Sequence, residues 1–141
     1  MPAIWFKPYT PAEANARGKN SMLEHLGIEL MEIGEDFLKA RMQVDARTRQ
    51  PGGVLHGGAS VALAETLASW AATMTTDPAR QYCVGLEINA NHVRAVPAGF
   101  VTGTARPAHL GRTTQIWEIR IENEAGKLVC VSRCTMAVLD R

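Results

Sequence analysis

A single carboxylate, Glu65, interrupts an uncharged run of small and apolar residues that extends from 57 to 76. An ionised carboxylate taken out of water without a partner loses much of its solvation, so proteins pair such a group or use it. No Lys or Arg lies within one helical turn of Glu65, so a cation partner has to come from elsewhere in the fold. The pattern favours a general base or nucleophile in a desolvated cleft. The alternative is a structural carboxylate at a subunit interface, hydrogen-bonded to Ser69 or to a backbone N–H.

The loop before this run supplies the other half of a candidate site. Residues 50–58 read QPGGVLHGG and lead directly into the expected helix. A helix N-terminus presents unpaired N–H groups and the positive end of the helix dipole, which stabilise a carbonyl oxygen that is becoming an oxyanion. Gly57 and Gly58 would let a ligand approach the backbone, although paired glycines also serve turns and close packing. A phosphate-binding loop is disfavoured because neither a GxGxxG motif nor a P-loop lysine is present.

The elements that position these residues follow from the hydrophobic pattern. The run over 57–76 predicts a helix that is buried on every side. A capping box at Thr10 and Glu13, with Pro11 at the first helical position, starts a shorter helical segment that ends near residue 27. Strands are expected over 28–33, 37–44, 83–93, 100–106, 113–122 and 128–139. One long helix segregated from a run of strands predicts an α+β fold with one antiparallel sheet.

Two strands carry more specific expectations. In the strand over 83–93, Val84, Leu86, Ile88 and Ala90 are expected to share one face. The strand over 100–106 is expected to end before Pro107. The last two strands are expected to form a hairpin through a turn at Gly126.

Length and composition limit the class of protein. The 141 residues, with no linker or repeat, predict a single domain over 1–141. A net charge of +1 offers no strong field for nucleic acid or an acidic membrane. The three cysteines include no close pair and no metal-ligand cluster, so reduced thiols and a metal-free site are expected. With no export signal at the N-terminus, the expected location is the cytoplasm.

Several motifs resemble a known family. Residues 53–60, GVLHGGAS, followed by Leu63, Ala64 and Glu65, resemble the signature of PaaI-type hotdog thioesterases. Residues 85–94, GLEINANHVR, and the later HLG at 109–111 resemble the bacterial 1,4-dihydroxy-2-naphthoyl-CoA and enterobactin-proofreading thioesterases. The likeness runs from about residue 47 to residue 139. It implies a hotdog fold, in which a curved antiparallel sheet of about six strands wraps one long helix, and the hydrolysis of an acyl-CoA thioester without a cofactor.

The resemblance also implies roles for individual residues. Glu65 would be the nucleophile or general base, and the Gly57 N–H would polarise the thioester carbonyl. Gln50 and His56 would position the thioester or the attacking water, and Ser69 would support Glu65 or that water. From the residues alone, Gln50, His56 and Ser69 can equally be a loop amide, a brace for the turn and a hydroxyl bonded to its own helix.

CoA contacts are implied at two further places. His92 and Arg94 would line the path of the pantetheine arm or of the phosphates. The turn that contains Gly111, Arg112 and Thr113 would contact the nucleotide end. Without the resemblance, these side chains have structural or solvated interpretations.

The spacing of Gly57 and Glu65 has a consequence for assembly. Eight residues along one helix separate their Cα atoms by roughly 12 Å, whereas a thioester carbon is attacked from about 3–3.5 Å. One glutamate side chain does not span that gap, so two subunits have to share each site. We therefore expect a homodimer, assembled further into a tetramer as a dimer of dimers, with no nucleic-acid or membrane partner.

Two other functions remain open on sequence grounds. A hotdog enoyl-thioester hydratase or dehydratase also uses a helix carboxylate beside a histidine, and a non-catalytic acyl-CoA-binding protein would keep the fold. The acyl group is expected to be aromatic, of the dihydroxynaphthoyl or benzoyl type, although aliphatic or carrier-bound acyl groups are alternatives. Its pocket is expected to include Leu67, Trp70 and Met74.

Overall fold

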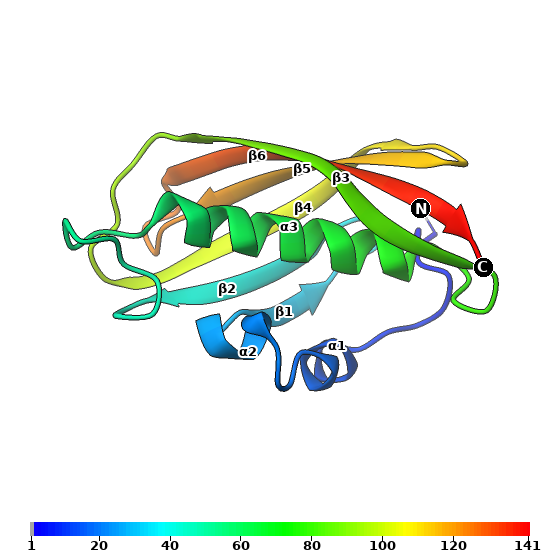
Figure 1. Ribbon diagram of the computed structural model, residues 1–141, viewed down its shortest axis with the longest axis horizontal. Coiled ribbons are helices and arrows are strands. Elements are labelled where there is room, and N and C mark those ends of the chain that lie inside the picture. The colour runs from blue at the N-terminus through cyan, green and yellow to red at the C-terminus, as the bar shows by residue number, and fades with distance from the viewer. Residues whose placement is uncertain (1) are drawn as a thin grey trace.

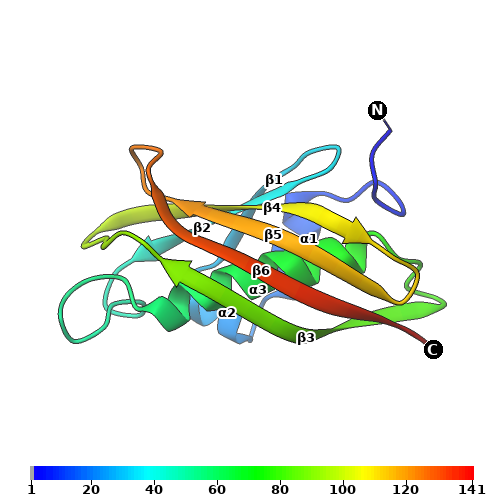
Figure 2. The ribbon, with the colours of Figure 1, turned by 90° about the horizontal axis from the view of Figure 1, so that it is seen from above.

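Six antiparallel strands form one curved sheet, and a long helix lies across one face of it (Figure 1). The structure is a computed structural model and describes residues 2–141. In chain order the elements are α1 (Pro11–Arg17), α2 (Met22–Leu26), β1 (Glu29–Ile33), β2 (Leu38–Val44), α3 (Gly57–Met74), β3 (Gln81–His92), β4 (Gly99–Leu110), β5 (Thr114–Glu122) and β6 (Leu128–Asp140). Across the sheet the strands run β1-β2-β4-β5-β6-β3, as Figure 2 shows from above. The expected α+β arrangement is confirmed, including the β5–β6 hairpin.

Alternating side chains of the central strands fill the space between the sheet and α3. The inward residues are buried almost completely on β2 (Leu38, Ala40, Met42, Val44) and on β5 (Trp117, Ile119, Ile121). Leu63, Leu67 and several alanines of α3 meet them. Gly103 on β4 permits the closest approach, since a Cβ there would lie 2.7 Å from Leu67 Cδ1. Small residues on both elements therefore let the sheet close on the helix.

A chain of buried and partly buried hydrogen bonds fixes the C-terminal end of α3. The Trp117 indole N–H donates to Gln115 Oε1 at 2.9 Å, and Gln115 Nε2 donates to Thr75 Oγ1 at 2.8 Å. Thr75, the residue that caps the helix, donates in turn to the Ala72 carbonyl. The helix is thus tied to the middle of the sheet by groups that would be costly to leave unpaired.

The segment before β1 forms a separate wall beside α3. The capping box of Thr10 and Glu13 is confirmed at the start of α1, and Gly27 ends α2 in the left-handed conformation. Asn15 ties α1 to β1, because its amide donates to the Leu30 carbonyl at 3.0 Å and accepts from the Leu30 N–H at 2.8 Å. The Phe6 N–H donates to the Met74 carbonyl at the end of α3. The wall is therefore held to both the sheet and the helix.

The expectation that Val84 and Leu86 share an inward face with Ile88 and Ala90 is wrong. Pairing between β3 and β6 shifts register between Gly85 and Glu87. Because side chains alternate along a strand, one extra residue reverses the faces of those that follow. Val84 and Leu86 are 39% and 60% exposed, whereas Ile88 and Ala90 pack against the core.

The expected end of the fourth strand is also wrong, since β4 continues through Pro107 to Leu110. Its pairing with β2 stops at Ala105, and its pairing with β5 shifts register between Pro107 and His109. A proline is tolerated at such a place because few ladder hydrogen bonds depend on its missing N–H.

Burial of α3 on every side does not occur within one protomer. The helix ends at Met74, and its side opposite the sheet is only partly covered. Glu65, Ser69 and Trp70 on that side are half-buried, and Thr73 is exposed. This side of α3 lines the mainly apolar groove described below.

The cysteines are free thiols, with Cys130 and Cys134 buried and Cys83 partly buried. Among residues 2–141, no helix is long and apolar enough to cross a membrane.

Candidate active site

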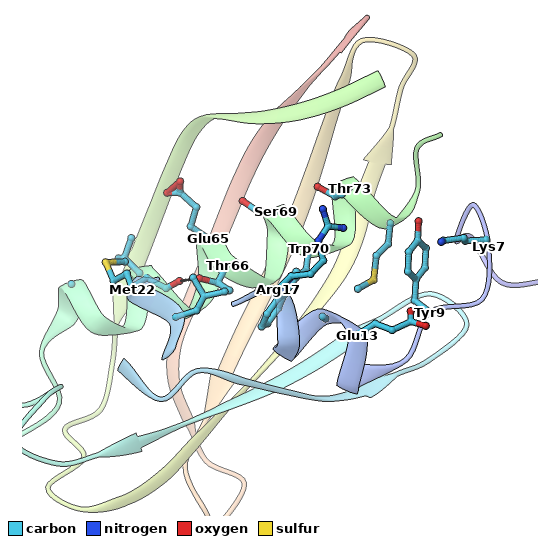
Figure 3. Close-up of a pocket in the computed structure, with 16 residues that line it drawn as sticks. Lys7, Tyr9, Glu13, Arg17, Met22, Glu65, Thr66, Ser69, Trp70 and Thr73 are labelled. Carbon is cyan, nitrogen blue, oxygen red and sulfur yellow. Dashed lines mark hydrogen bonds between the residues drawn. The ribbon is translucent and has the colours of Figure 1, made fainter. Parts of the chain in front are cut away.

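A mainly apolar groove of about 960 Å³ runs along the open side of α3. One wall is α3 itself, and the other is the segment from residue 7 to residue 23 (Figure 3). Glu65 and Ser69 line it one helical turn apart, and Trp70 and Met74 line it further along the helix. Leu67, expected here, is fully buried in the core on the opposite side of the helix. The groove thus joins the proposed catalytic carboxylate to two of the three predicted acyl contacts.

Glu65 lies between this groove and strand β3. A Cβ at Gly85 would lie 3.2 Å from Glu65 Oε2 and 3.9 Å from Met136 Sδ. The absence of a side chain at Gly85 therefore gives the carboxylate its room. The β3 register shift begins at the same glycine, and such bulges often re-aim groups beside active sites. The sequence analysis did not identify Gly85 as a site residue.

His56 is the N-cap of α3. Its Nδ1 accepts a hydrogen bond from the Gly58 N–H at 2.7 Å. A nitrogen that accepts from an amide carries no proton, so the neutral ring has its hydrogen on Nε2. The imidazole also explains the glycine, because a Cβ at Gly58 would lie 2.9 Å from His56 Nδ1. His56 can therefore brace the helix start and donate a hydrogen bond at the same time.

The backbone amides of the first turn are not equivalent. Gly58 donates to the His56 ring, and Ala59 and Ser60 donate to the His56 carbonyl. Gly57 has no hydrogen-bond acceptor among the residues that the structure describes. The free N–H at the positive end of this 18-residue helix is therefore that of Gly57.

His92, at the end of β3, lies against the same glycine. A Cβ at Gly57 would lie 2.9 Å from His92 Nε2. Two imidazoles, His56 and His92, thus flank the helix start, one over each glycine. Arg94 lies just beyond β3, and its Nε donates to the Leu128 carbonyl at 3.1 Å.

Gln50 belongs to the tight turn that precedes α3. Its Oε1 accepts from the Gly52 N–H, and its backbone N–H donates to the Val54 carbonyl at 2.8 Å. The side-chain Nε2 is left as the donor end of the amide. Gln50 therefore keeps a hydrogen-bond donor beside the loop that leads to His56.

The turn that contains Gly111, Arg112 and Thr113 lies away from His92 and Arg94. Thr114 on β5 pairs with Ala137 on β6, and Ala137 pairs in turn with Val84 on β3. His92 on β3 pairs with Cys130, near the other end of β6. Val84 and His92 are eight residues apart on β3, or roughly 26 Å. Within one protomer, the structure does not bring the two expected CoA-contacting groups together.

Gly57 and Glu65 likewise stay apart on one helix. The helix α3 is continuous from Gly57 to Met74, so the separation of roughly 12 Å expected from eight residues applies. Among residues 2–141, no group of three or more His, Cys, Asp or Glu side chains is placed to hold a metal ion.

Comparison with known proteins decides the family. Residues 52–130, more than half of the chain, match the model of the thioesterase superfamily. The chain belongs to the thioesterase superfamily. It is 51% identical over 136 residues to the proofreading thioesterase EntH of Cronobacter turicensis, covering 96% of this chain and 98% of that protein. It is 49% identical over 136 residues to the 1,4-dihydroxy-2-naphthoyl-CoA hydrolase of Escherichia coli, covering 96% and 99%.

Solved structures of thioesterases agree with this assignment. The crystal structure of a mutant thioesterase from Pseudomonas aeruginosa superimposes with a TM-score of 0.97 at 47% identity, covering 99% of this chain and 100% of that one. A thioesterase from Haemophilus influenzae gives 0.94 at 50% identity, covering 97% and 95%. The expected hotdog thioesterase fold is confirmed, and the enzyme is a thioester hydrolase.

Proposed function

We propose that this thioesterase hydrolyses acyl-CoA thioesters in a site shared by two copies of the chain. One copy supplies the start of α3, with the Gly57 N–H and the His56 imidazole. The other supplies Glu65 and Ser69. The observation that carries the proposal is the separation of the free Gly57 amide from Glu65 along one unbroken helix, which is too long for both to reach one carbonyl carbon.

In this arrangement the thioester oxygen accepts hydrogen bonds from the Gly57 N–H and from His56 Nε2–H. Both hydrogen bonds become stronger as negative charge develops on that oxygen, which lowers the activation barrier for attack on the carbonyl carbon. Glu65 attacks the carbonyl carbon to give an anhydride, or it removes a proton from a water that attacks. In the first route the C–S bond breaks as the anhydride forms, and a water then hydrolyses the anhydride to release the acid and restore Glu65. In the second route the C–S bond breaks after water has added to the carbonyl carbon, which gives the acid directly. In both routes the CoA sulfur leaves and takes a proton. Ser69, one turn from Glu65, orients the carboxylate or the water, and the Gln50 amide helps to hold the thioester.

A dimer of suitable geometry has a surface available. Strand β3 is an edge of the sheet, and within residues 2–141 no strand pairs on its outer side. It exposes Tyr82, Val84 and Leu86, and a bare apolar edge favours pairing with another strand. Two copies joined at β3 would bring their α3 helices side by side. The 111–113 turn of one copy could then reach the CoA that passes His92 and Arg94 of the other.

The relatives favour an aromatic acyl group. One protein that is 49% identical is named for 1,4-dihydroxy-2-naphthoyl-CoA, and the groove beside Glu65 presents Trp70 and Tyr9. Flat aromatic rings pack well against such side chains. We therefore propose aryl-CoA thioesters as the substrate class, to be compared with aliphatic ones by thiol release.

Two variants test the chemistry separately. Glu65→Gln keeps the shape of the side chain and should abolish most turnover without unfolding the protein. Gly57→Pro removes the N–H, and proline is well tolerated at the first position of a helix. Gly57→Ala is the matched control, because it adds a Cβ beside His92 but keeps the amide. Proline should lower kcat by roughly a hundredfold relative to alanine.

Mixing the two defects tests the shared site. In a mixed dimer of Glu65→Gln and Gly57→Pro chains, one of the two sites holds both intact groups. Random assembly of equal amounts should therefore restore about a quarter of wild-type activity. If each chain used its own Gly57 and Glu65, mixed dimers would stay as inactive as either variant alone. Near-normal kcat in Glu65→Gln would remove the carboxylate from the mechanism.

A further inference from the structure

The far end of the acyl groove carries a positive charge that the catalytic chemistry does not use. Glu65 and Thr73 both line the groove, eight residues apart on α3, which corresponds to roughly 12 Å. Toward the Thr73 end, the N-terminal wall contributes the polar side chains of Lys7, Tyr9, Glu13 and Arg17. An acyl group that extends from Glu65 past Trp70 would meet these side chains (Figure 3).

Arg17 is the group at this end without a fixed partner. In the described part of the chain, no carboxylate forms an ion pair with Arg17 and no acceptor is hydrogen-bonded to it. Glu13, one turn earlier on α1, has its carboxylate engaged by the Thr10 N–H in the capping box. Arg17 reaches from α1 toward α3 beside Trp70 (Figure 3). A guanidinium in this position has donors to offer, and none of them is hydrogen-bonded within residues 2–141.

Charged groups of both signs surround Tyr9. Lys7 Nζ lies 5.2 Å from the centre of the Tyr9 ring, and Lys7 and Arg17 line this end together with the carboxylate of Glu13. Burial raises the pKa of the Tyr9 hydroxyl, an effect that Arg17 opposes and Glu13 and Asp77 reinforce. Tyr9 is therefore a neutral hydroxyl that can donate at neutral pH.

We propose, building on the thioesterase function proposed above, that Arg17 selects acyl groups with an oxygen acceptor at the end far from the thioester. Arginine binds a carboxylate more strongly than a neutral acceptor, because both partners of the hydrogen bonds are then charged. The apolar middle of the groove holds the ring or chain, and Arg17, with Tyr9 beside it, holds its polar tail. The substrate class is therefore a medium-length or aromatic acyl-CoA whose distal end carries a carboxylate.

The test uses matched pairs of CoA thioesters that differ only at the distal end. Benzoyl-CoA is compared with 4-carboxybenzoyl-CoA, and octanoyl-CoA with its ω-carboxy counterpart, by kcat/KM for thiol release. In the wild type we expect the carboxylated member to be preferred. Arg17→Gln should lower that preference about fivefold, less than for a buried pair because Arg17 is exposed in the protomer. Cleavage of the uncharged member should change less than twofold.

Three controls make the result specific. Arg17→Lys keeps the charge and should keep most of the preference, whereas Arg17→Glu should reverse it. Lys19→Gln removes a cation from the same region but outside the groove and should have no effect on the ratio. A ratio that is the same in the wild type, Arg17→Gln and Arg17→Glu would overturn the role of Arg17. Glu65-dependent cleavage would persist in that case, whereas failure of the wild type to cleave any thioester would overturn the proposed function itself.

Discussion

The two ring nitrogens of His56 have different roles, so the contributions of this residue to stability and to catalysis can be tested separately. Nδ1 caps α3 through the Gly58 N–H at 2.7 Å, and Nε2–H is the donor that we assign to the thioester oxygen. Asparagine places an oxygen where Nδ1 lies and is among the best N-caps, but it has no group at the position of Nε2. Glutamine can place an amide N–H near Nε2 but caps poorly. Alanine removes both functions.

The expected magnitudes follow from these contacts. Loss of an N-cap costs about 1 kcal/mol, which corresponds to a fall in Tm of about 3 °C for a protein of this size. His56→Ala and His56→Gln should show this fall, and His56→Asn should not. Loss of a donor to the developing oxyanion costs roughly a hundredfold in kcat. His56→Ala and His56→Asn should show that loss, and His56→Gln should recover part of it.

The assay measures Tm and kcat for the wild type and the three His56 variants. Thermal unfolding is compared at one fixed protein concentration, because the Tm of an oligomer depends on concentration. Thiol release from an aryl-CoA gives kcat. Recovery of kcat in His56→Asn would refute the donor role and leave His56 as a cap alone. An unchanged Tm in His56→Ala would refute the contribution of the cap.

Three further substitutions test neighbouring features. Gly85→Ala places a Cβ 3.2 Å from Glu65 Oε2. The displaced carboxylate should lower kcat for thiol release about tenfold, with little change in Tm. An unchanged kcat would show that the room at Gly85 is not needed. Gln115→Ala leaves the buried Trp117 N–H without its acceptor and should lower the free energy of unfolding by about 1–3 kcal/mol in a denaturant titration. Burial, reinforced by Glu65 and Glu87, raises the pKa of Cys134 from 9.0 to about 12. The neutral thiol therefore contributes stability that is fully present below pH 9 and lost as the pH rises toward 12, and Cys134→Ala should weaken the loss of stability between pH 8 and pH 10.5; equal losses in both proteins would contradict this.

The strands and the long helix were predictable because their residues alternate or repeat without ambiguity. Leu38 to Val44 and Trp117 to Ile121 alternate between apolar and polar residues, and one face of each is buried as expected. The bulge at Leu86 was not predictable, because an extra residue in a strand leaves no mark on an apolar pattern. Pro107 was misleading, since its effect depends on whether β2 still pairs with β4 at that point.

The candidate site was predicted unevenly for a related reason. Glu65 and Gly57 stand out by charge and by position in the chain. Leu67 was misplaced because α3 is apolar on both sides, so composition does not tell the core side from the groove side. The contribution of Arg17 and Tyr9 was missed entirely, because packing of α1 beside α3 depends on contacts between segments that are about fifty residues apart.

The outer wall of the groove is built from a stretch of chain that takes no part in the sheet. Asn15 and the backbone of Phe6 hold it by a few hydrogen bonds, while the reacting groups stand on a helix anchored elsewhere. Exchange of residues 7–23 between relatives should therefore transfer the preference for an acyl group and leave the catalytic residues on α3 in place. Enzymes of this kind could therefore acquire new substrates through substitutions confined to residues 7–23.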